Sequence, residues 1–166
     1  MPVSNLPPII CVAGKPRVGK TTLLVHLIAE LRRRGYRIGV IKHSVHPFDM
    51  AQAGKDTWKH AQAGAEAVAF ASARELVLTR SLGAEMDIDT IAAMLGQVDL
   101  VLAEGYKRAQ KSKIEVSRRE LGTDLVCPPQ DLIAVVSDHS ITLDVPRFDL
   151  DDVAGLADLI EQRFLL

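Results

Sequence analysis

Residues 14–21, Gly-Lys-Pro-Arg-Val-Gly-Lys-Thr, hold two glycines and a Lys-Thr pair at the spacing G-x-x-x-x-G-K-[ST]. A short apolar run, residues 9–13, precedes them, and apolar residues from Leu23 to Leu31 recur at helical spacing after them. A strand, a glycine-bounded loop and a helix, in that order, form the context in which this pattern holds phosphate. The motif therefore predicts a phosphate-binding loop between a buried parallel strand and an amphipathic helix that Gly35 closes.

The chemistry expected of this loop follows from its residue types. Backbone N–H groups and the positive end of the following helix attract phosphate oxygens. Lys20 is expected to neutralise β- and γ-phosphate oxygens, and Thr21 to offer its hydroxyl to Mg²⁺. Pro16 has no N–H to give to phosphate, but its fixed φ preorganises the turn, and the loop resembles those of Era-like GTPases in placing Pro there.

Lys15 directly follows the first glycine, and two interpretations of it stay open. Its position resembles that of the signature lysine of MinD/ParA-type ATPases, which reaches across a dimer to the partner's nucleotide. The alternative is a solvated loop lysine without a role in binding.

The rest of the chain alternates strand-like and helical patterns. Strands are expected over 36–42, 66–72, 75–80, 99–106, 113–118 and 132–138, and helices over 54–65, 87–98 and 150–165. Polar and apolar residues alternate in the 113–118 run, which predicts a half-exposed strand. The whole pattern predicts an α/β fold of the phosphate-loop NTPase type: a mostly parallel sheet flanked by helices, a three-layer sandwich in a single domain over 1–166.

Composition excludes several classes of partner. Hydrophobic residues make up 48% and charged residues 25%, and a net charge of −1 gives no overall electrostatic footprint for nucleic acid or anionic membrane. No run has the length of a membrane span, and the N-terminus lacks the features of a signal peptide. Cys11 and Cys127 are expected to be free, buried thiols, so we expect a cytoplasmic protein.

Polar residues near strand ends are further candidates. Glu104 ends an apolar run, where a carboxylate can complete the Mg²⁺ shell. His43 and His46 follow the second strand and are either packed, hydrogen-bonding side chains or metal ligands. Asp49 and Asp56 are candidates to approach Mg²⁺ or to orient the attacking water, and spacing does not decide between them.

Asp138 ends another buried run. An aspartate at this place can accept hydrogen bonds from the N1–H and the exocyclic amine of guanine, which adenine does not offer. It can also close a turn with its own backbone, and both interpretations stay open.

Seven stretches, in order along the chain, resemble the molybdopterin-guanine dinucleotide biosynthesis protein B (MobB) family. They are GKTTLL (19–24), GYRIGVIKHSVHPFD (35–49), AGKDTWKHAQAGA (53–65), DLVLAEGYK (99–107), KIEVSR (113–118), IAVVSD (133–138) and FDLDDVAGLADLI (148–160). Their combination is much more specific than any single motif. The chain departs from the family pattern at Pro16 and Arg17, where Ser-Gly is common, and at Ala51, where many members have Asp.

This resemblance implies a SIMIBI-class fold that binds GTP with Mg²⁺, forms a homodimer and hydrolyses GTP slowly at most. It also implies an adapter that assists the MobA-like guanylyltransferase joining GMP to molybdopterin, with molybdoenzyme-specific chaperones as further partners. By motif, catalytic roles fall on Lys20, Asp49 and Asp56, and Mg²⁺ contacts on Thr21, Asp49 and Glu104. The nucleotide contacts that it implies are Gly14, Lys15, Pro16, Arg17, Val18, Gly19, Lys20, Thr21, Thr22, Lys42, His43 and His46.

Two other functions remain as alternatives at this point. One is a metallochaperone-like GTPase that holds an ion through His43 and His46. The other is a small-molecule kinase, for which the sequence shows no identifiable acceptor pocket or arginine-rich lid.

Overall fold

The computed structural model describes residues 6–44 and 55–166, with the side chain of Lys55 excepted. The chain divides into two compact units, one of residues 1–43 and 88–166 and the other of residues 44–87. Each unit is described by itself, and the expectation of a single domain stays a prediction.

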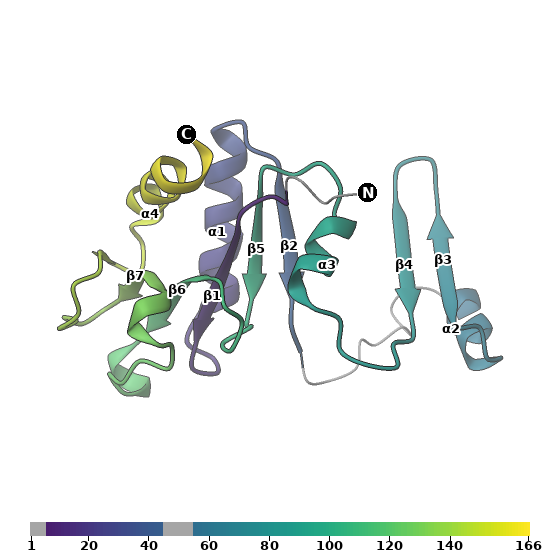
Figure 1. The fold of residues 1–166 in the computed structure, drawn as a ribbon, viewed down its shortest axis with the longest axis horizontal. Coiled ribbons are helices and arrows are strands. Elements are labelled where there is room, and N and C mark those ends of the chain that lie inside the picture. The colour runs from purple at the N-terminus through teal and green to yellow at the C-terminus, as the bar shows by residue number, and fades with distance from the viewer. Residues whose placement is uncertain (1–5, 45–54) are drawn as a thin grey trace. The chain divides into compact units, whose positions relative to one another are not determined.

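The larger unit is built on a six-stranded parallel sheet (Figure 1). Its strands, in spatial order, are β2 (Ile38–Lys42), β5 (Leu100–Glu104), β1 (Ile9–Gly14), β6 (Ser112–Ser117), β7 (Leu132–Ser137) and β8 (Arg147–Phe148). The predicted α/β fold with a mostly parallel sheet is confirmed. Because all six strands run the same way, their carboxyl ends meet at one edge, which is where such sheets bind ligands.

Helices cover both faces of this sheet. On one face, α1 (Lys20–Arg33) and α4 (Val153–Ile160) pack over the apolar side chains of alternate β1 residues, including Ile10. On the other face, α3 (Ile88–Met94) packs over a second cluster that includes Cys11. These three layers bury the centre of β1 completely, which fixes the position of the loop that follows it.

The last helix starts later than the sequence analysis predicts. The predicted helix runs from residue 150, whereas α4 begins at Val153 and continues as a π-helical turn over Glu161–Leu165. The start is set by Asp152, whose carboxylate accepts a hydrogen bond from the N–H of Gly155 at 3.0 Å and so caps the helix.

The prediction that β6 is half-exposed is wrong. It lies between β1 and β7, and Lys113–Ser117 are all buried. Lys113 is buried because its ammonium contacts Asp131 at 2.8 Å and the carbonyl of Ala109. The segments before and after β6 therefore close over the polar face of the strand and take the place of solvent.

The smaller unit contains α2 (Lys55–Gln62) and an antiparallel hairpin of β3 (Ala67–Ala71) and β4 (Leu76–Arg80). Both strands were expected from the sequence. Large apolar side chains of the hairpin are exposed, namely those of Phe70, Leu76, Val77 and Leu78. Successive residues of a strand point to opposite faces, so both faces of this hairpin carry exposed apolar groups.

Among the described residues, no helix combines the length and apolarity needed to span a membrane. Both cysteines, Cys11 and Cys127, are free and buried, as expected.

Candidate functional site

The phosphate loop joins β1 to α1 at the carboxyl edge of the sheet. Gly14 has φ 142° and Gly19 has φ 105°, values that favour glycine. A Cβ atom at Gly14 would lie 2.4 Å from the carbonyl oxygen of Val116 on β6. The first glycine of the motif is therefore required by the close approach of two neighbouring strands as well as by the turn.

The loop and the first turn of α1 border a cleft of about 280 Å³. Its lining residues are Arg17, Gly19, Lys20, Thr21, Thr22 and Glu104. The structure thus brings the predicted strand-end acid to the predicted phosphate loop. Pro16 is exposed and Val18 is buried, so neither side chain lines the cleft.

The ammonium of Lys20 bends back over its own loop. It donates hydrogen bonds to the carbonyl oxygens of Gly14 at 3.2 Å and Lys15 at 2.8 Å. Burial lowers the pKa of this lysine, and the nearby Glu104 carboxylate opposes the effect. A cation over the loop carbonyls is in place to meet phosphate oxygens that bind to the loop N–H groups.

Thr21 and Glu104 make direct contact at the start of α1 and the end of β5. The Thr21 hydroxyl donates to Oε1 of Glu104 at 2.9 Å, and Lys42 Nζ lies 3.9 Å from the same oxygen. Lys42 and Glu104 are paired in register on neighbouring strands. A hydroxyl and a carboxylate are the oxygen ligands that Mg²⁺ prefers, so these two residues fit the expected ion.

Lys15 is held within its own chain. Its ammonium donates to the carbonyl oxygens of Leu121 at 2.9 Å and Gly122 at 3.2 Å, in the segment that follows β6. The interpretation of Lys15 as a solvated loop lysine is therefore wrong, because these two contacts link the phosphate loop to the next strand's loop. A contact across a dimer stays a prediction.

Arg118 is a site residue that the sequence reasoning missed. Its Nε donates to the carbonyl oxygen of Val18 at 2.9 Å, and its Nη2 lies 3.5 Å from where a Cβ of Gly19 would be. The available signal was a basic residue directly after β6, the strand next to the one that carries the phosphate loop. Arg118 adds a positive charge beside the loop.

His43 packs where β2 ends. Its ring lies 4.7 Å from the ring of Tyr106, centroid to centroid, at an angle of 42°. The backbone N–H of His43 donates to the carbonyl oxygen of Glu104 at 3.0 Å. This contact agrees with the interpretation of a packed histidine. His46 and Asp49 lie outside the described residues.

Asp56 belongs to the smaller unit, where its carboxylate is exposed and lies 3.5 Å from Lys59 Nζ. Its role at the nucleotide stays a prediction. Within residues 6–44 and 55–166, no cluster of three or more His, Cys, Asp or Glu residues could hold a metal ion.

Asp138 follows β7 and links two loops. Its Oδ1 accepts a hydrogen bond from the N–H of Arg119 at 2.8 Å, and this bond is the main reason that the pKa of the Asp138 carboxyl is lowered. The structure thus shows the aspartate bonded to the protein backbone, but to a neighbouring loop rather than only to its own turn.

Comparison with known proteins gives consistent results. The family model described as "Molybdopterin guanine dinucleotide synthesis protein B" matches residues 9–138. The molybdopterin-guanine dinucleotide biosynthesis adapter protein of Escherichia coli (strain K12) is 37% identical over 160 residues, covering 92% of this chain and 91% of the relative. The adapter protein of Haemophilus influenzae is 32% identical, covering 96% and 90%.

Solved structures agree with these relatives. A crystal structure of molybdopterin-guanine biosynthesis protein B is 29% identical, with a TM-score of 0.72 over 93% of this chain and 98% of the other. Bacillus subtilis MobB, at 24% identity, has a TM-score of 0.76 over 95% and 98% and supports the fold. The chain belongs to the molybdopterin guanine dinucleotide synthesis protein B (MobB) family.

Proposed function

We propose that this protein is a cytoplasmic GTP-binding adapter in molybdenum-cofactor biosynthesis, which assists the MobA-like guanylyltransferase that forms molybdopterin guanine dinucleotide. The observation that carries the nucleotide-binding part is the convergence of Lys20, Thr21 and Glu104 on one cleft at the carboxyl edge of the sheet. The relatives named as adapter proteins of this pathway support the rest.

The residues of the cleft have separate parts in holding the nucleotide. Loop N–H groups between Gly14 and Lys20 bind phosphate oxygens, and the Lys20 ammonium moves from the loop carbonyls to those oxygens. The Thr21 hydroxyl and the Glu104 carboxylate hold Mg²⁺. The ion neutralises charge between the β- and γ-phosphates.

The proposal includes slow hydrolysis, far below the ~1–10³ s⁻¹ of typical enzymes. Activation of a water needs a base within hydrogen-bond reach of it. Among the described residues that line the cleft, Glu104 is the one carboxylate, and Thr21 already bonds it. The site is thus better supplied for holding GTP than for cleaving it.

The proposal also includes a homodimer. A two-stranded hairpin is marginal by itself, and Leu76 and Leu78 are 72% and 63% exposed. Pairing of two β3–β4 hairpins from two copies would cover these apolar side chains. Sedimentation of the wild type against a Leu76→Ser/Leu78→Ser variant tests this part, and a monomeric wild type would exclude it.

The nucleotide site is tested by Lys20→Ala, with Arg32→Ala as a matched control. Both remove one positive charge from α1, but Arg32 is exposed in its last turn, at the far end from the phosphate loop. We expect Lys20→Ala to weaken GTP binding in Mg²⁺ at least tenfold without lowering the unfolding temperature, and Arg32→Ala to bind as the wild type does. Unchanged GTP affinity in Lys20→Ala would overturn the proposed site.

The adapter role is tested by capture of the guanylyltransferase. The purified enzyme should bind the wild type in the presence of GTP and Mg²⁺, and bind Lys20→Ala less well under the same conditions. Absence of binding to the wild type with or without nucleotide would contradict the adapter role while leaving the nucleotide site intact.

A further inference from the structure

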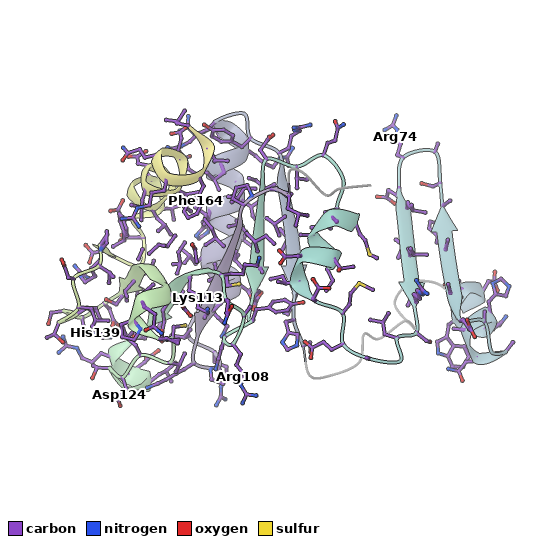
Figure 2. The ribbon with its side chains drawn as sticks, viewed as in Figure 1. Arg74, Arg108, Lys113, Asp124, His139 and Phe164 are labelled. Carbon is purple, nitrogen blue, oxygen red and sulfur yellow. The ribbon has the colours of Figure 1, made fainter. Side chains whose placement is uncertain are left out.

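A second cavity, larger than the phosphate cleft, lies at the ends of β6 and β7. Its volume is about 700 Å³, and its walls come from the segments that follow the two strands. The side chains that matter here are those of Arg119, Asp124, Leu125, His139, Ile141 and Leu143. Figure 2 shows Asp124 and His139 on the same side of the larger unit, beyond the ends of these strands.

The two cavities flank the phosphate loop on opposite sides. Thr21 and Glu104, which would hold Mg²⁺ under the proposed function, lie beside β5, and β5 and β6 lie on opposite sides of β1. If the γ-phosphate lies at this ion, the nucleoside extends away from β5 and toward β6 and β7. The second cavity lies in that direction.

The segment that follows β6 lies between the phosphate loop and this cavity, and hydrogen bonds hold it at both places. Arg118 and Lys15 bond it to the phosphate loop, as described above. Farther along, the buried Glu115 carboxylate accepts hydrogen bonds from the N–H groups of Val126 at 2.7 Å and Cys127 at 2.9 Å. One wall of the cavity is thus held in place by a buried charge.

A buried histidine holds another part of the cavity's lining in place. His139 Nε2 lies 2.9 Å from the Ser117 hydroxyl, and the Ser137 hydroxyl donates to the His139 carbonyl oxygen at 2.7 Å. Leu125, Ile141 and Leu143 pack against an apolar cluster that includes Ala13 of β1 and Val135 of β7. The cavity therefore combines apolar side chains with a few fixed polar groups, which is typical of small-molecule sites.

We propose, on the basis of the proposed function, that this cavity binds a ring with the amino-oxo-pyrimidine edge shared by guanine and pterins, and that Asp124 recognises this edge. The edge offers a ring N–H beside an exocyclic amine, and then a carbonyl oxygen. The Asp124 carboxylate accepts from the two donors, and the Arg119 guanidinium donates to the carbonyl. Leu125 and Ile141 contact the face of the ring.

Asp124 is better placed for this role than Asp138, for which the sequence left base recognition and a turn contact both open. Asp138 does not line the cavity, and its carboxylate is bonded to the N–H of Arg119. Asp124 lines the cavity with an exposed side chain, and no hydrogen bond or ion pair engages it within the described part of the chain.

The test is a change of specificity, measured by titration calorimetry with GTP and XTP in Mg²⁺. Xanthine carries a carbonyl where guanine carries the amine, so Asp124→Asn can donate to that carbonyl while still accepting from the ring N–H. We expect this variant to lose GTP affinity about tenfold to a hundredfold and to gain a similar factor for XTP. Asp144→Asn, an exposed charge outside the cavity, should keep the wild-type preference.

A second arm separates the two sources of the ring. Guanosine and a free pterin, neither of which carries phosphate, are titrated into the wild type, Asp124→Asn and Lys20→Ala. A GTP-to-XTP switch identifies the base of the nucleotide as the ring. Pterin binding that is lost in Asp124→Asn but kept in Lys20→Ala, without a switch, identifies a pterin, and this result holds even if the proposed phosphate site fails.

Two results would overturn the assignment. One is the XTP switch in Asp138→Asn instead of Asp124→Asn. The other is an Asp124→Asn variant that matches the wild type for GTP, XTP, guanosine and pterin. Loss of GTP binding in Lys20→Ala, measured beside them, shows that the failure belongs to the cavity and not to the phosphate site.

Discussion

The hydroxyl of Thr21 donates a hydrogen bond of 2.9 Å to Oε1 of Glu104, across 83 residues of sequence. This bond brings the first turn of α1 to the end of β5 at the point where a nucleotide-bound Mg²⁺ is expected. Under the proposed function these two residues provide oxygen ligands to the ion, and Glu104 is the one of the two that carries a charge.

Glu104→Gln should therefore separate metal-dependent from metal-independent binding. The amide can still accept from Thr21, but its lack of charge weakens the hold on Mg²⁺. We expect GTP affinity in Mg²⁺ to fall about tenfold to a hundredfold, with no change when the metal is chelated by EDTA. Equal affinities for the variant and the wild type in Mg²⁺ would contradict the role, and Glu75→Gln in the exposed hairpin is the charge-matched control.

Gly14→Ala should cost more stability than Gly35→Ala. Both glycines have positive φ, 142° and 99°, and an L-residue in the left-handed region costs about 1–2 kcal/mol. A Cβ at Gly35 meets no atom within 4 Å, whereas at Gly14 it would lie 2.4 Å from the Val116 carbonyl oxygen. Urea unfolding should show the larger loss in Gly14→Ala, together with weaker GTP binding, and equal losses in the two variants would rule out the steric cause.

Asp131→Asn should destabilise the protein more than its partly exposed position suggests. Lys113 is fully buried, and Asp131 is the carboxylate that its ammonium contacts. Loss of that charge leaves a buried cation with carbonyl partners alone, at a cost of about 1–3 kcal/mol in the free energy of unfolding.

The double variant Lys113→Met/Asp131→Asn should recover much of that loss, because it removes the buried charge as well. Urea unfolding of the wild type, the single variant and the double variant measures both steps. A double variant that is less stable than the single one would show that Lys113 stabilises the protein independently of Asp131.

The lowered pKa of the Glu30 carboxyl should make the stability of the protein depend on pH. Hydrogen bonds from Arg33 and Arg34 lower the pKa of its carboxyl to about 2. Because the folded-state pKa lies below the unfolded one, of about 4.3, the stabilisation is complete above that value and is lost as the pH falls toward 2. The Arg34 side chain also bonds Asp158 and Glu161, so this group connects α1 to the C-terminal helix.

Unfolding temperatures of the wild type and Glu30→Gln should therefore differ at pH 6 and converge as the pH falls from about 4 to 2. A difference that stays constant down to pH 2 would contradict the assignment.

The parts of the site that the sequence predicted were those with local patterns. The phosphate loop is a contiguous motif between a strand and a helix, and Glu104 ends an apolar run in a parallel sheet. Both inferences need only the rule that carboxyl ends of parallel strands meet at one edge. The predicted helices and strands were of the right type because they too depend on local patterns. The start of α4 was missed because a single cap at Asp152 sets it.

The parts that were missed depend on contacts distant in sequence. Lys15 meets Leu121 across 106 residues, and no pattern around either residue indicates the other. The polar residues of β6 alternate with apolar ones, as they would in a strand that faces water. A strand face that is covered by a polar loop and one that is exposed to solvent show the same alternation in the sequence. Their burial follows only from how the segments before and after β6 close, which the sequence does not display.

The buried Glu115 carboxylate has a consequence for the order in which this protein folds. In the unfolded chain, Glu115 and Lys113 are hydrated. The face of β6 that carries them stays hydrated until the backbone N–H groups of Val126 and Cys127 replace the water around Glu115. We therefore expect the central sheet and the loop beside the second cavity to form in the same cooperative step. Val126 and Cys127, although they lie in a connecting segment, should have amide protons that exchange as slowly as those of the core strands.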